Sequence, residues 1–166
     1  IPWEELTKAA FKFAAADLGI NASDAVRDEL IAADQSLPAF PEANAALRRL
    51  TKKFDIYVLS MGSLWMIEQS QKNAGIDHYF KANLTTQDRR IYKPGRSAYE
   101  LGVELIGQAC DKIAFVSGNS FDVIGAKNFG FPTIWVRRYD QILDDLGLEP
   151  DLVVRDLKEM AEALGT

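Results

Sequence analysis

Residues 114–122 read Ala-Phe-Val-Ser-Gly-Asn-Ser-Phe-Asp. The apolar run at the start of this stretch is typical of a short buried strand, and the small polar residues after it predict a loop that leads into a helix. Asp122 stands where that helix begins. In open α/β sheets, ligands bind in the crevice outside the carboxyl ends of the strands. The stretch therefore indicates both a fold class and a place for a site.

Strands and helices alternate along the chain from residue 54 onward. Apolar runs predict strands near 55–60, 82–85, 113–117, 133–136 and 152–154. Helical spacing predicts helices near 64–74, 95–107, 121–128, 139–146 and 156–164. Because such alternation implies right-handed crossovers, we predict an α/β fold with a mostly parallel sheet and helices on both of its faces.

The first 50 residues carry a different pattern, in which apolar residues recur at helical spacing and no strand is indicated. We therefore predict a helical subdomain at residues 1–50 joined to an α/β core at residues 51–166.

Composition limits the classes of function. The 166 residues include 48% hydrophobic and 26% charged residues, as in an ordinary globular protein, and carry a net charge of −5. The negative charge argues against nucleic acid and an acidic membrane surface as partners, so an anionic substrate needs local lysines or arginines. The single cysteine, Cys110, excludes an internal disulfide and fits a reducing cytoplasm. No membrane span or signal peptide is visible, and the chain opens on Ile1, which indicates that it was processed, trimmed or only partly recorded.

Two further polar residues follow apolar runs in the sequence. Lys93 lies in Ile-Tyr-Lys-Pro-Gly-Arg, residues 91–96, and Ser60 ends the run at residues 56–59. We expect Ser60, Lys93 and Asp122 to converge on one crevice, because all three follow or lie near predicted parallel strands. An ammonium, a carboxylate and a hydroxyl suit the binding of an anion and attack by an activated water.

Each of these residues also has a plainer interpretation, and both stay open at this stage. Lys93 alone is typical of a solvated surface lysine. Asp122 and Asn119 are preferred helix caps, as are Ser60 and Ser63. The pattern around Phe121 fits either the crevice or the core.

Other residues narrow the chemistry. Gly125 and Gly130 indicate close helix packing and a helix stop. His78 is the only histidine and stands in a predicted exposed turn, so no Ser-His-Asp triad and no histidine metal site can be assembled from it.

Taken together, three segments resemble motifs of the haloacid dehalogenase superfamily of hydrolases. Residues 58–63 (Val-Leu-Ser-Met-Gly-Ser) are similar to the second motif, residues 91–101 to the third and residues 115–131 to the fourth. The closest resemblance is to the type II L-2-haloacid dehalogenases. It covers nearly the whole chain and includes the leading helices, which look like part of that family's cap, and it implies a Rossmann-like core.

The resemblance also implies roles. An aspartate attacks the carbon that bears the halogen, halide leaves, and water hydrolyses the aspartyl ester. Lys93 would steady the charges of nucleophile and substrate, and Asp122 would orient or deprotonate the water. Ser117 and Asn119 would hold the lysine and the ester by hydrogen bonds.

On the substrate side, the resemblance implies that Ser60 binds the substrate carboxylate. Tyr99 would support the pocket, with Phe121 and Met61 beside it. Met61 departs from the family, which usually has asparagine there as a cradle for the halide. Gly118 departs where related phosphatases carry an acid for magnesium. Chemistry with no metal and no other cofactor is therefore favoured.

The nucleophile's segment has no match, because no Asp-x-x-Gly-Thr-like sequence precedes Trp3. We expect the natural polypeptide to be longer by one strand, its loop and the first part of the cap, and these 166 residues alone to be inactive. Lys93 and Asp122 are expected to face each other with room between them for the missing aspartate.

Three functions follow, in order of preference. The first is hydrolytic dehalogenation of short 2-haloacids, small anionic substrates, through an aspartyl ester. The second is a magnesium-dependent phosphatase of the same superfamily, and the third is a non-catalytic fragment that binds anions or a partner. The resemblance also implies a possible homodimer, for which the apolar residues of the leading helices offer a surface.

Overall fold

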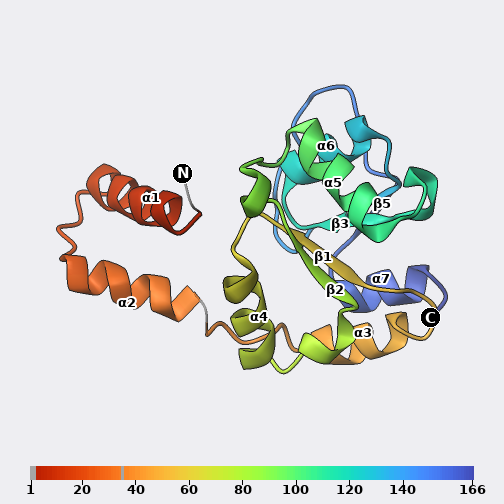
Figure 1. Ribbon diagram of the computed structural model, residues 1–166, viewed down its shortest axis with the longest axis horizontal. Helices are drawn as coiled ribbons and strands as arrows, with labels where there is room; N and C mark the ends of the chain where they lie inside the picture. The colour runs from red at the N-terminus through yellow and green to blue at the C-terminus, as the bar shows by residue number, and fades with distance from the viewer. Residues whose placement is uncertain (1–2, 35) are drawn as a thin grey trace. The chain divides into compact units, whose positions relative to one another are not determined.

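The structure is a computed structural model that describes residues 3–34 and 36–166 (Figure 1). Contacts divide the chain into two compact units. Unit 1 comprises Ile1–Ala39 and Tyr57–Arg90, and unit 2 comprises Phe40–Ile56 and Ile91–Thr166. Each unit contains parallel strands together with helices, so the predicted α/β class is confirmed.

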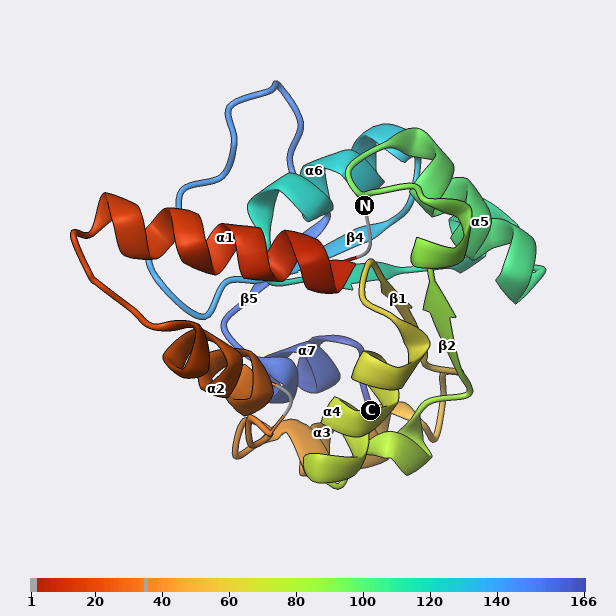
Figure 2. The same cartoon turned by 60° about the vertical axis from the view of Figure 1, so that its left-hand side comes forward.

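Unit 1 combines a helical hairpin with a small sheet. Helices α1 (Trp3–Asp17) and α2 (Asp24–Asp34) lie side by side (Figure 2). Strands β1 (Tyr57–Ser60) and β2 (Ala82–Thr85) pair in parallel, with Ser60 opposite Thr85. Helix α4 (Leu64–Asn73) packs on β2. Short 3₁₀ turns η1 (Asp77–Tyr79) and η2 (Gln87–Arg89) flank β2 in the chain.

Unit 2 is built on a three-stranded parallel sheet of order β3-β4-β5. The strands are β3 (Phe115–Ser117), β4 (Thr133–Val136) and β5 (Leu152–Val154). Every residue of the central strand β4 is buried. This agrees with its β-branched and aromatic composition, since central parallel strands are covered on both faces. The helices are α3 (Ala43–Leu50), α5 (Arg96–Ile106), α6 (Ser120–Phe129) and α7 (Leu157–Ala163), and η3 (Cys110–Lys112) is a 3₁₀ turn.

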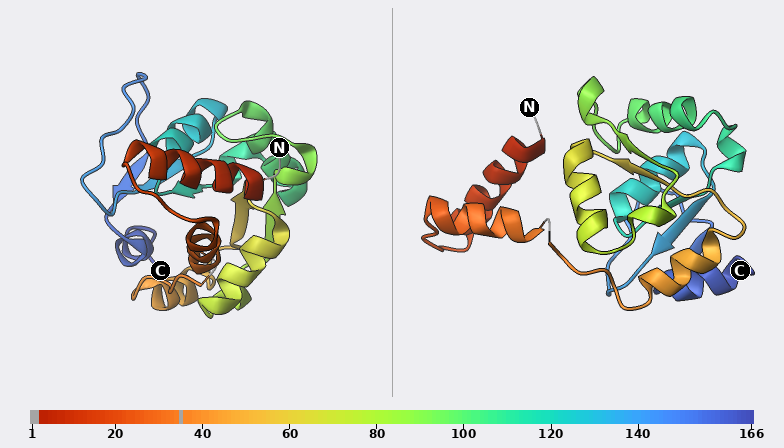
Figure 3. Two further views of the ribbon diagram at one scale, coloured as in Figure 1. Left: turned by 90° about the vertical axis from the view of Figure 1, so that its left-hand side faces the viewer. Right: turned by 60° about the horizontal axis from the view of Figure 1, so that its bottom comes forward.

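Helices cover both faces of this sheet. Strand register puts Ile134 on the same face as Val116, and this face packs on α3 and α7, the orange and blue helices that lie side by side in Figure 3. Phe115 and its register partner Thr133 both lie on the other face of the sheet, where the Phe115 ring contacts that of Tyr99 in α5. Because side chains alternate along a strand, one three-stranded sheet supports two separate packing layers.

Most predicted elements are present, and one is wrong. The segment predicted as a helix near 139–146 forms no helix. Its apolar residues have the right spacing, but Ile142 is 89% exposed and so gains nothing from a helical face. Asp144 and Asp145 would also stand at the C-terminal end of the helix, where the helix dipole disfavours acids.

The five described strands form two sheets, with orders β1-β2 and β3-β4-β5. No described pairing links the two sheets. Helix α3, expected within the helical subdomain at residues 1–50, belongs by its contacts to unit 2. The boundary between a helical subdomain and an α/β core stays a prediction, since compact units and fold domains are different divisions. None of the described helices is both long and apolar enough to cross a membrane.

Candidate active site

Asp122 occupies the first turn of α6, just beyond the end of β3. The partial positive charge at a helix N-terminus favours a carboxylate in this turn. The side chain is nevertheless 4% exposed, so its charge needs close partners.

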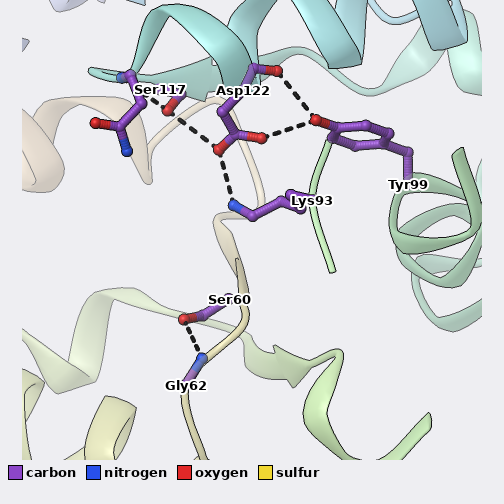
Figure 4. Close-up of polar contacts among 7 residues, drawn as sticks. Ser60, Gly62, Lys93, Tyr99, Ser117 and Asp122 are labelled. Atoms are coloured by element: carbon purple, nitrogen blue, oxygen red, sulfur yellow. Dashed lines mark hydrogen bonds and ion pairs between the residues drawn. The ribbon is translucent and has the colours of Figure 1, made fainter. Parts of the chain in front are cut away.

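Those partners come from three places in unit 2 (Figure 4). Lys93 Nζ donates to Asp122 Oδ2 over 2.8 Å, and Ser117 Oγ donates to the same oxygen over 3.2 Å. Tyr99 Oη lies 2.9 Å from Asp122 Oδ1 and donates to it. A carboxylate has roughly four acceptor positions. The three donors therefore leave room for about one more, such as a water.

Lys93 is held by a tight turn before α5. Gly95 N donates to the carbonyl of Tyr92 over 2.9 Å, which closes the turn around Lys93 and Pro94. The lysine side chain is only 10% exposed, and Nζ lies 5.5 Å from the centroid of the Phe115 ring. Lys93 is thus a largely buried cation on a fixed turn, and its interpretation as a solvated lysine is wrong.

Lys93 and Asp122 touch directly, so the prediction that they face each other is confirmed. The predicted gap between them is absent, because 2.8 Å between Nζ and Oδ2 leaves no space for another carboxylate there.

Tyr99 supports Asp122 from behind. Its side chain is fully buried, and its hydroxyl also lies 3.2 Å from the Asp122 carbonyl oxygen. Burial first, and then the nearby Asp122 charge and hydrogen bond, raise the pKa of Tyr99 well above its ordinary value. The hydroxyl therefore stays protonated and acts as a donor. Tyr99, assigned to the substrate side of the pocket from sequence, contacts the carboxylate.

The helix-cap interpretation of Asp122 fails on these contacts, because its carboxylate binds side chains. Asn119 holds the N-cap position of α6, but its side chain makes no capping hydrogen bond. Its backbone N donates to Ser117 Oγ over 3.1 Å, and its side chain is exposed. Phe121 is 42% exposed in the same turn.

Ser60 belongs to unit 1, at the end of β1. Its Oγ accepts from Gly62 N over 3.1 Å, so it braces the turn after the strand. Ser63 caps α4 by accepting from Met66 N over 3.3 Å, which confirms the cap interpretation for that serine. Met61 between them is partly buried. Convergence of Ser60 with Lys93 and Asp122 stays a prediction, because these residues lie in different units.

A cavity of about 350 Å³ opens beside Ser60 within unit 1. Apolar and polar side chains mix along its wall, and the lining residues are Trp3, Val58, Ser60, Gly62, Met66, Ile67, Ser70, Gln71 and Phe80. This volume lies within the range of small-molecule sites. The sequence did not indicate the cavity, since Gln71 and Phe80 are far from Ser60 along the chain.

Sequence reasoning also missed two ion pairs of unit 2. Arg138 Nη2 lies 2.5 Å from Glu42 Oε1, and its guanidinium lies 3.6 Å from the centroid of Phe40. Lys127 Nζ lies 2.5 Å from Asp151 Oδ1. Neither pair has a local sequence signal, because each joins residues more than 20 positions apart.

Comparison with known proteins gives consistent results. The family model described as haloacid dehalogenase-like hydrolase matches residues 3–130. The (S)-2-haloacid dehalogenase H-109 of Pseudomonas putida is 32% identical over 163 residues, which cover 98% of this chain and 73% of that protein. The haloacetate dehalogenase H-2 of Moraxella sp. (strain B) is 35% identical over 155 residues, 93% of this chain and 69% of that protein.

Among solved structures, the L-2-haloacid dehalogenase of Xanthobacter autotrophicus with chloropropionic acid covalently bound is similar to this chain. The TM-score is 0.90 and the identity 26%, over 99% of this chain and 76% of that one.

Proposed function

Because the chain belongs to the haloacid dehalogenase-like hydrolases, we propose that it releases halide from short 2-haloacids by hydrolysis. The supporting observation is the buried Lys93–Asp122 pair, with Tyr99 and Ser117 as further donors to the carboxylate. The dehalogenases named above supply the substrate class.

The reaction has two steps. In the first step, an aspartate carboxylate oxygen attacks C2 of the substrate. The new carbon–oxygen bond forms as the carbon–halogen bond breaks, and halide leaves with the electron pair of the broken bond. Water then attacks the ester carbonyl, which regenerates the carboxylate and releases a 2-hydroxyacid. Asp122 is already bound to Lys93, so we assign Asp122 to the second step. The carboxylate that attacks C2 in the first step is that of the aspartate for which the sequence has no matching segment.

Asp122 suits the hydrolytic water for a geometric reason. Its three side-chain donors fix the carboxylate and leave about one acceptor position, which can bind a water proton. Lys93 binds Oδ2, the other oxygen of this carboxylate, as a point charge and stabilises the anionic intermediate in a setting of low dielectric. Asn119, with its exposed side chain, is assigned to the ester oxygen.

We assign the substrate's carboxylate to the end of β1. Ser60 lines the cavity there together with Gly62, and a hydroxyl with nearby backbone amides is a suitable anion binder. Met61 and Phe121 are assigned to the apolar part of the substrate.

The test replaces Asp122 by asparagine in the full-length polypeptide. With 2-chloropropionate, the parent should release halide continuously. D122N should lower kcat by about 10²- to 10⁴-fold, because the water loses its base. It should still release a burst of about one halide per site and retain a covalent ester, detected as a mass increase.

The matched control is D111N, since Asp111 is 73% exposed on η3 and takes no part in the site. D111N should keep the parent's turnover. Equal turnover by D122N and the parent would contradict the role of Asp122. Phosphate release that depends on magnesium, with no halide release, would instead identify a phosphatase. Anion binding without turnover would identify a binding fragment.

Three finer features are also proposed: a cap formed by the leading helices, action in the cytoplasm and a homodimer. The exposed Phe13 of α1 supports the dimer, because its side chain is 74% exposed. Sedimentation velocity of the full-length polypeptide tests the dimer, and cell fractionation tests the location.

A further inference from the structure

We propose that Gly125 is a positioning residue of the Lys93–Asp122 pair and acts through Tyr99. The inference rests on the proposed function only for its kinetic readout. Gly125 lies in α6 one turn after Asp122, and residues three apart on a helix share a face.

The space at Gly125 is filled by neighbours from another element. A Cβ at this position would lie 2.5 Å from Tyr99 Oη and 2.6 Å from Pro94 Cβ. Both distances are below any that real Cβ atoms show. Any side chain at 125 must therefore displace the tyrosine hydroxyl, the proline or helix α6 itself.

Tyr99 cannot easily yield, because its ring is packed on several sides. The ring centroid lies 5.4 Å from that of Phe115, 5.8 Å from that of Phe129 and 6.2 Å from that of Phe131. Its side chain is fully buried in this aromatic cluster. Displacement at the hydroxyl is therefore transmitted to the hydrogen bond that Tyr99 donates to Asp122.

Pro94 couples the same point to the other half of the pair. It follows Lys93 directly in the turn closed by Gly95 N, and its Cα would lie 3.3 Å from the added Cβ. A shift of Pro94 moves the lysine backbone, while a shift of Tyr99 moves the carboxylate. Because Gly125 has no Cβ, both Tyr99 and Pro94, which support the two halves of the ion pair, can lie close to α6.

Helix formation gives no reason for glycine here. The residue is in the interior of α6, away from the left-handed conformation that Gly130 adopts at the helix end with φ of 116°. Glycine in a helix interior is disfavoured relative to alanine. Close approach of Tyr99 and Pro94 accounts for the glycine.

The experiment replaces Gly125 by alanine in the full-length polypeptide and measures kcat and KM for 2-chloropropionate. The kcat should fall by about 10- to 100-fold, as expected for a small misplacement of catalytic groups. The KM should stay within about threefold, because the affected step is chemical. The control variant is N128A, an exposed position of the same helix, which should match the parent.

A double-mutant cycle tests the route through Tyr99. Y99F removes the hydroxyl that the new Cβ meets, so G125A should cost clearly less kcat in the Y99F background than in the parent. Equal losses in the two backgrounds would overturn the proposal. So would a G125A variant with the parent's kcat, or one whose only change is a lower Tm.

A measurement without turnover separates this inference from the proposed function. In protein labelled with ¹³C at tyrosine Cζ, the resonance lost in Y99F identifies Tyr99, and G125A should shift that resonance while N128A should not. A shift supports the positioning role even where the parent releases no halide. An unmoved resonance overturns the role even in an active dehalogenase.

Discussion

Asp122 illustrates how a single buried charge determines its surroundings. An ionised carboxylate away from water is costly unless it is paired and hydrogen-bonded. Here a lysine, a serine and a tyrosine satisfy it, and the tyrosine is kept protonated because its own pKa is raised by burial and by Asp122. The same contacts that make the charge tolerable also orient it for chemistry.

Because the Lys93–Asp122 pair is largely buried, we expect its disruption to lower the free energy of unfolding. Lys93→Met keeps most of the side-chain volume but removes the ammonium and leaves Asp122 charged with one partner fewer. The free energy of unfolding should fall by about 3–5 kcal/mol, the usual cost of breaking a buried pair. Urea unfolding at neutral pH measures the change.

Two comparisons sharpen this measurement. K112M removes a lysine that is 70% exposed and should change stability by less than about 0.5 kcal/mol. The double variant K93M/D122N removes both charges and should recover part of the loss. A K93M protein as stable as the parent would show that the pair is more hydrated than its burial indicates.

Strands β4 and β5 are joined at their starts by Asp151. Its Oδ2 accepts from Thr133 N over 2.8 Å and from Thr133 Oγ1 over 3.1 Å, while Oδ1 faces Lys127 of α6. The hydrogen bond from Lys127, followed by that from the Thr133 backbone, lowers the pKa of Asp151. One carboxylate therefore links two strands and a helix.

A stability difference that depends on pH follows from the lowered pKa. The charged form is favoured in the folded state, so Asp151 stabilises the fold above its unfolded pKa of about 4 and loses this contribution as the pH falls through the folded pKa. D151N should lower the free energy of unfolding by about 1 kcal/mol at neutral pH, a small value because the side chain is 48% exposed.

The loss should hold from neutral pH down to about 4 and shrink as the pH falls further, through the folded pKa. Urea unfolding at several pH values on both sides of about 4 follows it. D145N serves as the control, since Asp145 lies exposed in the loop before β5. A D151N deficit that stays constant over this range would assign the effect to geometry and not to charge.

One apolar cluster of unit 2 lies between the sheet and helices α3 and α7. Leu50 of α3 is 3% exposed in this cluster, together with Ile134 and Met160. Leu50→Ala should therefore cost about 2–5 kcal/mol of unfolding free energy through lost burial and a cavity.

The control for this variant is I142A in the same unit, because Ile142 is 89% exposed. It should change stability by less than about 0.5 kcal/mol. Thermal or urea unfolding of the full-length polypeptide compares the two. A small effect at Leu50 would show that the α3–α7 layer contributes little to the stability of the fold.

Local pattern alone was enough to predict the class of this molecule and most of its strands, because apolar runs and turn residues act over a few positions. It was also enough to single out Lys93 and Asp122, because each follows or lies near a short apolar run, whereas Ser117 was assigned a role through the family resemblance. It failed at residues 139–146, where helical spacing meets no partner surface.

Tertiary structure decided which meaning each polar residue takes. Asp122 is a member of a buried ion pair and Ser63 is a cap, although both residue types prefer caps. Tertiary contacts also explain why position 125 is a glycine and why Asp151 pairs with Lys127. The two ion pairs and the contacts around Gly125 join residues that are distant in the chain. No local pattern encodes such contacts, because burial and partners exist only once the elements have packed.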